Sequence, residues 1–270
     1  MPIRVKAQIA AIGVDRGGTW TRAAAFDSRM RRVKTVRFRT APLRTLPEEL
    51  KRKISGWPQG HSIPLVIATR GALSRKWKKP FLLKALKGKL NLIDVISDAE
   101  AAHFAAFKGK PGILLISGTG AVAFSGKPGS FKMHGGRNPP SGDPGSGRWL
   151  GRRYLDLLGR LGEADAMGHG RSAAYAGTLL ARAERGHKTC ATIAAAAQHE
   201  LAALLAAAAG EGKSVVKAAL AGGLMGSVYF RTGFIRTARR ALPGRRLVFV
   251  ELLMTAEEAA ARIALLRRKK

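Results

Sequence analysis

The sequence is short of cysteine and of acidic residues, and it contains no long apolar run. One cysteine, Cys190, among 270 residues excludes an internal disulfide and an iron–sulfur cluster held by a single chain. So little cysteine is typical of a reducing compartment, and we expect a cytoplasmic protein. No segment reaches the roughly 18 uninterrupted apolar residues of a membrane helix, so we expect no membrane partner. The apolar run before Asp15 leads into glycines without a small-residue cleavage site, which predicts a strand and not a signal peptide.

The scarcity of acidic residues leaves a large excess of positive charge. Asp and Glu number 17 against 48 Lys and Arg, which gives a formal net charge of +31. Such a surface attracts anions, including nucleotides, phosphorylated metabolites and nucleic acid. The basic residues are scattered, and no helix-turn-helix, zinc-finger or aromatic-rich RNA motif accompanies them, so nucleic acid is not the expected partner. A general surface bias is the simplest interpretation, and an anionic substrate or membrane surface remains open.

The two halves of the chain follow the same predicted plan: a strand, a glycine turn and a second strand. The first copy spans residues 7–27 and continues into a third strand at 33–39, which predicts an antiparallel meander. The second copy spans residues 112–126. A length of 270 residues allows one large α/β domain or two ordinary lobes, and the repeated plan favours two.

Strands and amphipathic helices alternate around these hairpins, with a lobe boundary expected near residues 108–111. The predicted domains are therefore 1–108 and 109–270, with the final helix free to pack back on the first lobe. Further strands are expected at 63–69, 92–97, 215–223 and 246–253, and helices at 47–54, 79–88, 98–109, from about 148, twice within 173–209, at 225–242 and at 255–268. Residues 134–147 have the composition of a loop.

The first glycine turn has the sequence DRGGTWTR. Gly17 and Gly18 let the backbone turn tightly, so that amide groups can face a phosphate. The hydroxyls of Thr19 and Thr21 can do the same, and Asp15 at the strand end can hold a hydrated Mg²⁺ ion. The GK[ST] signature of a P-loop is absent, and the same residues also suit a plain hairpin in which they serve only the turn.

The second glycine turn and one aspartate complete the candidate site. Gly118, Thr119 and Gly120 permit close approach of the backbone to a phosphate or a sugar, and a strand follows them where a Rossmann fingerprint would have a helix. Asp98 ends a buried strand and opens a helix. A carboxylate there can act as general base on an acceptor hydroxyl, although Ser97 and Asp98 also suit simple helix capping, with Glu100 completing a capping box.

Five segments together resemble the BadF/BadG/BcrA/BcrD ATPase family, whose members include N-acetylglucosamine kinase. In chain order they are VDRGGTWTR, ISDAEAA, LLISGTGAVAF, GDPGSGRWLGR and ALAGGLMGS. The resemblance implies an α/β fold of the two-lobed actin-like ATPase (ribonuclease H-like) type with an interlobe nucleotide cleft. It also implies an ATP- and Mg²⁺-dependent kinase that acts on a small carbohydrate, in particular an amino sugar.

The resemblance assigns roles to individual positions. Asp98 would be the catalytic base, and Asp15 would hold Mg²⁺. The residues implied for ATP are Asp15, Gly17, Gly18, Thr19, Thr21, Thr119, Gly120, Gly222 and Gly223. The residues implied for the acceptor are Asp98, Ala121, Gly136, Arg137, Asn138 and Asp143.

Two departures from the family pattern bear on the acceptor. Sugar kinases of the family have a segment resembling GGWG, and this chain has GGRN, with Arg137 in place of the aromatic residue. That guanidinium can pair with a carboxylate or phosphate on the acceptor, or it can face solvent. The GDEGS segment is GDPGS here, so Pro144 removes a carboxylate and a backbone donor. The alternatives are a non-catalytic regulator that binds nucleotide or sugar, and an ATPase with a non-sugar acceptor; a homodimer also remains open.

Overall fold

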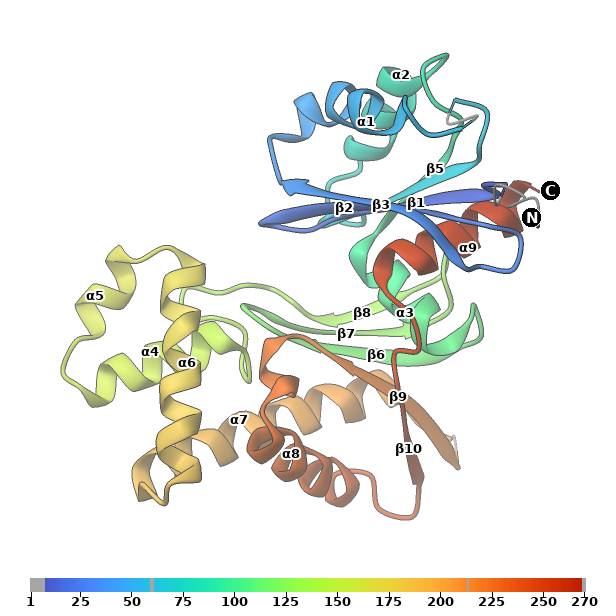
Figure 1. The fold of residues 1–270 in the computed structure, drawn as a ribbon. Helices are drawn as coiled ribbons and strands as arrows, with labels where there is room; N and C mark the ends of the chain where they lie inside the picture. The colour runs from blue at the N-terminus through green and yellow to red at the C-terminus, as the bar shows by residue number, and fades with distance from the viewer. Residues whose placement is uncertain (1–7, 59–60, 213, 269–270) are drawn as a thin grey trace, which may run out of the picture. The chain divides into compact units, whose positions relative to one another are not determined.

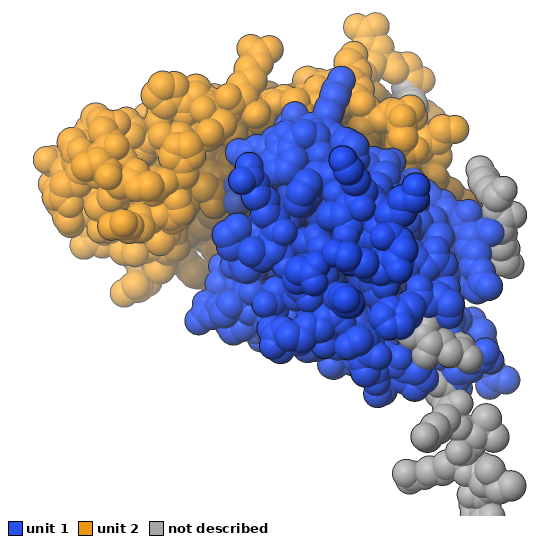
Figure 2. Space-filling model, turned by 90° about the horizontal axis from the view of Figure 1, so that it is seen from above, with its two compact units in different colours: residues 1–108, 252–270 blue, residues 109–251 orange. Residues whose placement is uncertain are grey.

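The computed structural model describes residues 8–58, 61–212 and 214–268. Ala7, where we expected the first strand to begin, lies outside them. The chain divides into two compact units, coloured separately in Figure 2. Unit 1 takes in the described residues of Met1–Lys108 and Leu252–Lys270, and unit 2 comprises those of Gly109–Glu251.

Unit 1 is built on a five-stranded mixed sheet with the order β3-β2-β1-β4-β5 (Figure 1). The strands are β1 (Ala11–Arg16), β2 (Trp20–Phe26), β3 (Arg32–Arg39), β4 (Leu65–Thr69) and β5 (Leu92–Ser97). The first three form the predicted antiparallel meander. Strands β1, β4 and β5 run parallel, so their carboxyl ends lie along one edge of the sheet.

Helices cover both faces of this sheet. They are α1 (Leu46–Ile54), preceded by the short η1 (Leu43–Thr45), then α2 (Lys78–Leu86), α3 (Asp98–Phe107) and α9 (Ala256–Arg268). Because strand side chains alternate, Ile12 and Val14 of β1 join one apolar cluster with α1 and α2. Ala11 joins the other cluster, with α3 and α9. The last helix of the chain is therefore part of the core of unit 1.

Unit 2 repeats the topology of unit 1 with the strand order β10-β9-β6-β7-β8. The strands are β6 (Gly112–Ser117), β7 (Ala121–Gly126), β8 (Lys132–Gly135), β9 (Val215–Ala221) and β10 (Arg246–Val250). The pair β6–β7 is the predicted second hairpin, and β9 runs parallel to β6. The third strand, β8, was not expected, because the glycines at its end read as a loop from residue 134 onward.

The helices of unit 2 are mostly those that the sequence predicts. They are α4 (Gly147–Leu157), α5 (Leu161–Ala166), α6 (His169–Glu184), α7 (Lys188–Ala209), the short η2 (Gly223–Gly226) and α8 (Val228–Arg240). Two details differ from expectation. Helix α5 was not expected. Helix α8 begins at Val228 and not at Met225, because the Ser227 hydroxyl accepts from the Phe230 amide and caps the helix there.

Helix α7 is long and apolar enough, by length and composition alone, to cross a membrane, and it is one such helix in the described part of the chain. The helix is not an uninterrupted apolar run, because Gln198, His199 and Glu200 lie within it. In this structure Ala194, Leu201 and other α7 residues are buried in the core of unit 2, against strands and neighbouring helices.

Candidate functional site

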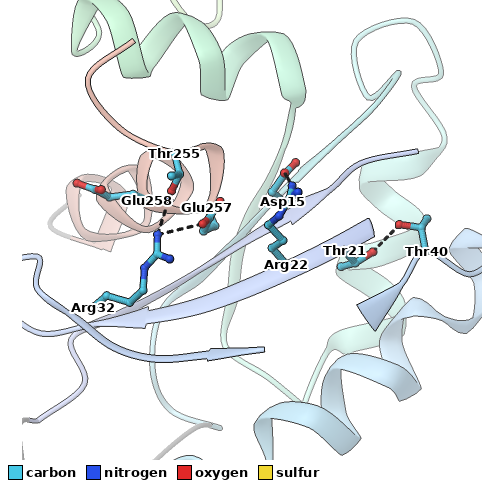
Figure 3. A network of polar contacts seen from close by, with 8 residues as sticks. All are labelled: Asp15, Thr21, Arg22, Arg32, Thr40, Thr255, Glu257 and Glu258. Atoms are coloured by element: carbon cyan, nitrogen blue, oxygen red, sulfur yellow. Dashed lines mark hydrogen bonds and ion pairs between the residues drawn. The ribbon is translucent and has the colours of Figure 1, made fainter. Parts of the chain in front are cut away.

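The first glycine turn joins β1 to β2 in unit 1. The Gly17 amide donates to the Trp20 carbonyl at 3.0 Å, which closes the turn. Gly18 and Thr19 are exposed at its tip and are free to face a ligand. Thr21, by contrast, is fully buried, and its hydroxyl lies 3.0 Å from that of Thr40 (Figure 3). Its predicted contact with phosphate therefore has to compete with a hydrogen bond inside unit 1.

Asp15 lies at the carboxyl end of β1, on the sheet face that α9 covers. Its Oδ2 accepts from Arg22 Nη1 at 3.3 Å across the β1–β2 ladder (Figure 3). Burial raises the pKa of the Asp15 carboxyl, and the charge of Glu257 on α9 raises it further, while Arg22 opposes both. Glu257 is itself buried and pairs with Arg32 at 3.1 Å. Two carboxylates thus lie in one region, and each is paired with one arginine.

Asp98 is the first residue of α3, directly after β5. Its position is fixed by the predicted capping box, in which the Ser97 hydroxyl accepts from the Glu100 amide and the Glu100 carboxylate accepts from the Ser97 amide. The Asp98 side chain is exposed, and one carboxylate oxygen accepts from the Ala99 amide at 3.0 Å. Asp15 is paired with Ala68 in the parallel ladder, and Ala68 is paired with Ile96, so Asp15 and Asp98 lie at the same edge of the sheet. The charge of Asp98 also contributes to raising the Asp15 pKa, after burial and Glu257.

The second glycine turn, between β6 and β7, is held by the loop that precedes α4. The Gly147 amide donates to the Gly118 carbonyl at 2.7 Å, and the Ser117 hydroxyl donates to the Gly145 carbonyl at 2.9 Å. The turn itself is closed by the Gly118 amide on the Gly120 carbonyl. Thr119 at its tip is partly exposed. The turn is therefore a rigid feature with an accessible backbone.

Asp143 connects three segments that the sequence assigned to the acceptor. One carboxylate oxygen accepts from the Ala121 amide at 3.2 Å, and the other accepts from the Asn138 amide at 2.6 Å. The carboxyl group is buried, and a Cβ on Gly120 would lie 2.8 Å from it. Both oxygens of Asp143 thus bind the protein's own backbone, although each has a second lone pair for a ligand.

The segment from Gly136 to Asn138 is exposed, Arg137 included. Gly136 and Asn138 both have positive φ angles, of 69° and 49°. Arg148 of α4 binds this segment: its Nη1 donates to the Asn138 side-chain oxygen at 3.4 Å and to the Pro139 carbonyl at 3.2 Å. Sequence reasoning gave Arg148 no role, and no local pattern marks it.

A cavity of about 850 Å³ lies within unit 2 beside the second glycine turn. That volume falls in the range of small-molecule sites. Thr119 and Gly223 line it, so the structure brings together two residues predicted for the nucleotide. Gly222, with φ of 97°, permits this closeness, because a Cβ there would overlap the Ser117 carbonyl oxygen.

One wall of the cavity is formed by α6, which sequence reasoning did not connect with the site. Small residues follow one another along this face at helical spacing; they are Gly170, Ala173, Ala174, Gly177 and Ala181. The signal was present in the sequence as a periodic row of glycine and alanine within an alanine-rich stretch. Because small residues also serve simple helix packing, such a row does not by itself identify a site.

The residues that the sequence assigned to the site fall into two groups, one in each unit. Asp15, Gly17, Gly18, Thr19, Thr21 and Asp98 lie in unit 1, and Thr119, Gly120, Ala121, Gly136, Arg137, Asn138, Asp143, Gly222 and Gly223 lie in unit 2. Among the described residues, no group of three or more His, Cys, Asp and Glu side chains is placed to hold a metal ion. A metal at Asp15 would thus need ligands from a substrate or water.

No model of a known protein family matches the chain, and no curated protein matches it. Solved structures do match. A candidate N-acetylglucosamine kinase from Chromobacterium violaceum is 22% identical with a TM-score of 0.64, and the match covers 95% of this chain and 97% of that one. A ROK family glucokinase from Streptomyces griseus, in complex with glucose and AMPPNP, is 18% identical with a TM-score of 0.63, and the match covers 97% and 100% of the two chains.

A transcriptional regulator of the ROK family, a homologue of the E. coli MLC protein, also matches. It is 13% identical with a TM-score of 0.60, and the match covers 96% of this chain and 77% of that one. Kinases and a regulator thus share this architecture at low sequence identity to the chain, so the structural similarity is evidence for the fold alone. The chain has the α/β fold of the two-lobed actin-like ATPases, with a five-stranded sheet in each unit.

Proposed function

We propose that the protein is an ATP-dependent kinase that transfers the γ-phosphoryl group to a hydroxyl of a small carbohydrate. The observation that carries the proposal is the position of Asp98. An exposed carboxylate, held rigidly by a capping box at the carboxyl edge of parallel strands, lies near the Asp15 carboxylate of a glycine turn. Ligands of open α/β sheets bind at this edge.

In this mechanism Asp98 is the general base. Its carboxylate orients the acceptor hydroxyl and takes the proton as the hydroxyl oxygen bonds to the γ-phosphorus. The bond from that phosphorus to the oxygen bridging it to the β-phosphorus breaks, and ADP leaves with the electron pair. The hydrogen bond from the Ala99 amide holds the carboxylate in place.

The cavity of unit 2 is our candidate site for the adenosine moiety. Most of its lining residues are glycine or alanine, which leave room for a flat ring, and Thr119 of the second turn also lines it. We propose that backbone amides of the two glycine turns bind the phosphates, with Gly17, Gly18 and Thr19 in unit 1 and Thr119 and Gly120 in unit 2. Gly222 lets the end of β9 approach Ser117 closely, and Gly223 lines the cavity.

Asp15 is our candidate ligand for a magnesium ion. Burial raises the pKa of the Asp15 carboxyl, the charges of Glu257 and Asp98 raise it further and Arg22 opposes them, and a bound cation would stabilise the ionised carboxylate. Mg²⁺ typically binds one or two carboxylates together with water and substrate phosphates. When bound, it would neutralise phosphate charge during transfer. Asp15 is the residue that would hold it.

The acceptor is proposed to be a sugar, with an amino sugar as the first candidate because one structural neighbour is a candidate N-acetylglucosamine kinase. Membership of the BadF/BadG/BcrA/BcrD family and a cytoplasmic location belong to the same proposal. Ala121, Gly136, Arg137, Asn138 and Asp143 remain predicted acceptor residues. Asp143 would act by holding Ala121 and Asn138 in place and by offering a free lone pair to a hydroxyl.

The direct test follows ADP release with ATP, Mg²⁺ and a panel of sugars. We expect Asp98→Asn to lower kcat by about 10²–10⁴-fold without loss of ATP binding, the range for a missing general base. Asp156→Asn is the matched control, because Asp156 is also an exposed helical aspartate but belongs to α4 of unit 2 and has no predicted role. Equal turnover by the Asp98→Asn variant and the wild type would remove Asp98 from the mechanism.

A non-catalytic regulator is the second candidate, and one observation favours it: a ROK family transcriptional regulator shares the fold. Pro144 and Arg137, which depart from the sugar-kinase pattern, point the same way. Calorimetry separates the candidates. Binding of ATP or a sugar with no acceptor-dependent ADP release across the panel would support the regulator, and stoichiometric ADP with each sugar phosphate formed would exclude it.

A further inference from the structure

Three strand ends in unit 1 place polar residues in one row beside Asp98. Arg16 ends β1, Thr69 ends β4, and these two residues are paired in the parallel ladder. Thr69 is paired in turn with Ser97, the residue before Asp98. Because strand side chains alternate, Arg16 and Thr69 point to the sheet face covered by α1 and α2, like Val14 and Ile67, which belong to that apolar cluster.

Two polar atoms of this row are buried without a partner among the described residues. Thr69 is fully buried, and its hydroxyl makes no hydrogen bond. The Arg16 Nε is also buried and unpaired, although the other end of its guanidinium donates to the Ala41 carbonyl at 2.7 Å. Unpaired buried polar atoms are uncommon in folded proteins because each one lowers stability. A hydrogen-bonding group bound at this sheet edge would offer a partner to both atoms, which lie on paired residues of the ladder.

Lys78, the first residue of α2, brings a third donor to the same place. It is 7% exposed, and its ammonium group donates to the carbonyl of Arg70, the residue after Thr69, at 2.6 Å. An ammonium has three N–H donors, so two remain for other acceptors. Burial lowers the Lys78 pKa, and the charges of Arg75 and Arg16 lower it further, while Asp98 raises it.

The cations of this cluster are not neutralised by the protein. Within the described residues, no carboxylate forms an ion pair with Arg16, Arg70, Arg75 or Lys78. The contrast is Asp94 on the neighbouring β5, a buried carboxylate that pairs with both Lys79 and Arg267. In unit 1 the buried charge of Asp94 is therefore compensated by two cations, whereas the buried charge of Lys78, beside Asp98, has no ion-pair partner among the described residues.

We infer that Arg16, Thr69 and Lys78 form a binding site for an anionic group on the acceptor, so that the preferred substrate is an acidic sugar. A carboxylate or a phosphate would accept from Lys78 and Arg16 and would supply the missing partner of Thr69. The site lies entirely in unit 1, and none of its residues lines the cavity of unit 2. Its place beside Asp98, the residue proposed as base, is what assigns it to the acceptor. The inference rests on the proposed kinase function, because only a kinase has an acceptor. Binding of an anionic sugar to the site can be measured without turnover.

The experiment compares acceptors that differ in one charged group. ADP release and calorimetric binding are measured with neutral hexoses and N-acetylhexosamines, with carboxylated sugars, and with sugar phosphates, for the wild type, Lys78→Met and Thr69→Val. Lys76→Met is the control, because Lys76 is an exposed neighbour of the same charge. ATP-analogue affinity is measured for every variant, since the phosphates of the nucleotide are the other source of the same chemistry.

We expect one anionic class to be preferred by the wild type and to lose about 10- to 100-fold in kcat/KM with Lys78→Met, mainly through KM, with ATP-analogue affinity unchanged. Turnover of neutral sugars should change little, and Lys76→Met should match the wild type. The carboxylated and phosphorylated sugars distinguish the two anions. A preference for neutral sugars, or weaker ATP-analogue binding by Lys78→Met with no change in acceptor preference, would overturn the inference and leave the kinase intact. Lys78-dependent binding of an acidic sugar without turnover would support the site and overturn the kinase.

Discussion

The carboxylate of Asp143 accepts the backbone amide of Ala121, the first residue of β7, and so ties the second glycine turn to the loop before α4. Its other oxygen holds the amide of Asn138 in the predicted acceptor segment. An acidic residue in a predicted substrate pocket thus serves the architecture of the pocket as well as its chemistry. Mutagenesis distinguishes the two roles, because loss of the structural role lowers stability and loss of the chemical role lowers turnover.

We expect Asp143→Ala to destabilise unit 2 by roughly 2–4 kcal/mol, because the substitution leaves a buried amide unpaired and removes a second hydrogen bond. Urea unfolding would measure the change. Asp156→Ala, at an exposed aspartate of α4, should lie within about 0.5 kcal/mol of the wild type. Loss of turnover by Asp143→Ala at unchanged stability would contradict the structural role.

Gly13→Ala should destabilise unit 1. A Cβ at this position would overlap the Glu257 carbonyl oxygen and lie 2.7 Å from the Ala261 amide nitrogen, so α9 would have to move away from β1. Overpacking against backbone costs about 3 kcal/mol. Thermal unfolding would detect it, and Gly56→Ala, where a new Cβ meets nothing within 4 Å, is the control. Equal melting temperatures for the wild type and Gly13→Ala would contradict the close packing of α9 against β1.

Lys78→Met should raise stability at neutral pH while it impairs acceptor binding. Burial lowers the folded-state pKa of Lys78 below its ordinary value of 10.5, so the charged form disfavours folding at pH values below the folded pKa. The penalty falls as the pH rises through the folded pKa toward 10.5. The stability gain of Lys78→Met over the wild type should therefore shrink between neutral and strongly alkaline pH. Urea titrations at several pH values would show this, and a gain that grows with pH would contradict it.

Gly177→Leu should block the cavity of unit 2 without unfolding it. A Cβ on Gly177 meets nothing within 4 Å, and leucine is the better helix former by roughly 1 kcal/mol, so stability should be kept or raised. The side chain would project into space that α6 shares with Thr119 and Gly223. We expect at least about a tenfold loss of ATP-analogue affinity by calorimetry if adenosine binds there.

Thr178→Leu is the matched control for Gly177→Leu, because Thr178 is the next residue of α6, is exposed and does not line the cavity. Its affinity should equal that of the wild type. If Gly177→Leu binds the nucleotide as well as Thr178→Leu does, the cavity is not the adenosine site.

Features that depend on local sequence were predictable. The repeated strand, glycine turn and strand predicted both hairpins, and the spacing of Ser97 and Glu100 predicted the capping box and with it the position of Asp98. Each of these is decided within a few residues by backbone geometry and side-chain capping. The resemblance in five segments added the fold, which the structural neighbours bear out.

Features that depend on contacts between distant segments were not predictable from one sequence. Glu257 influences Asp15 only because α9 returns to the first sheet, some 240 residues later in the chain. Lys78, in the basic run RKWKK, reads as a solvated residue, and only the packing of α2 against the sheet buries it. The strand β8 forms by pairing with β7 and has no strong strand signal of its own.

The return of α9 to unit 1 bears on how the chain is made. Unit 2 is a continuous stretch and can close its core as soon as it has left the ribosome, whereas the sheet face around Gly13 stays uncovered until α9 has been synthesised. We therefore expect unit 2 to be able to complete its fold before unit 1, although unit 1 begins first in the chain. A nascent chain cut before residue 252 would leave a finished unit 2 joined to a half-covered sheet.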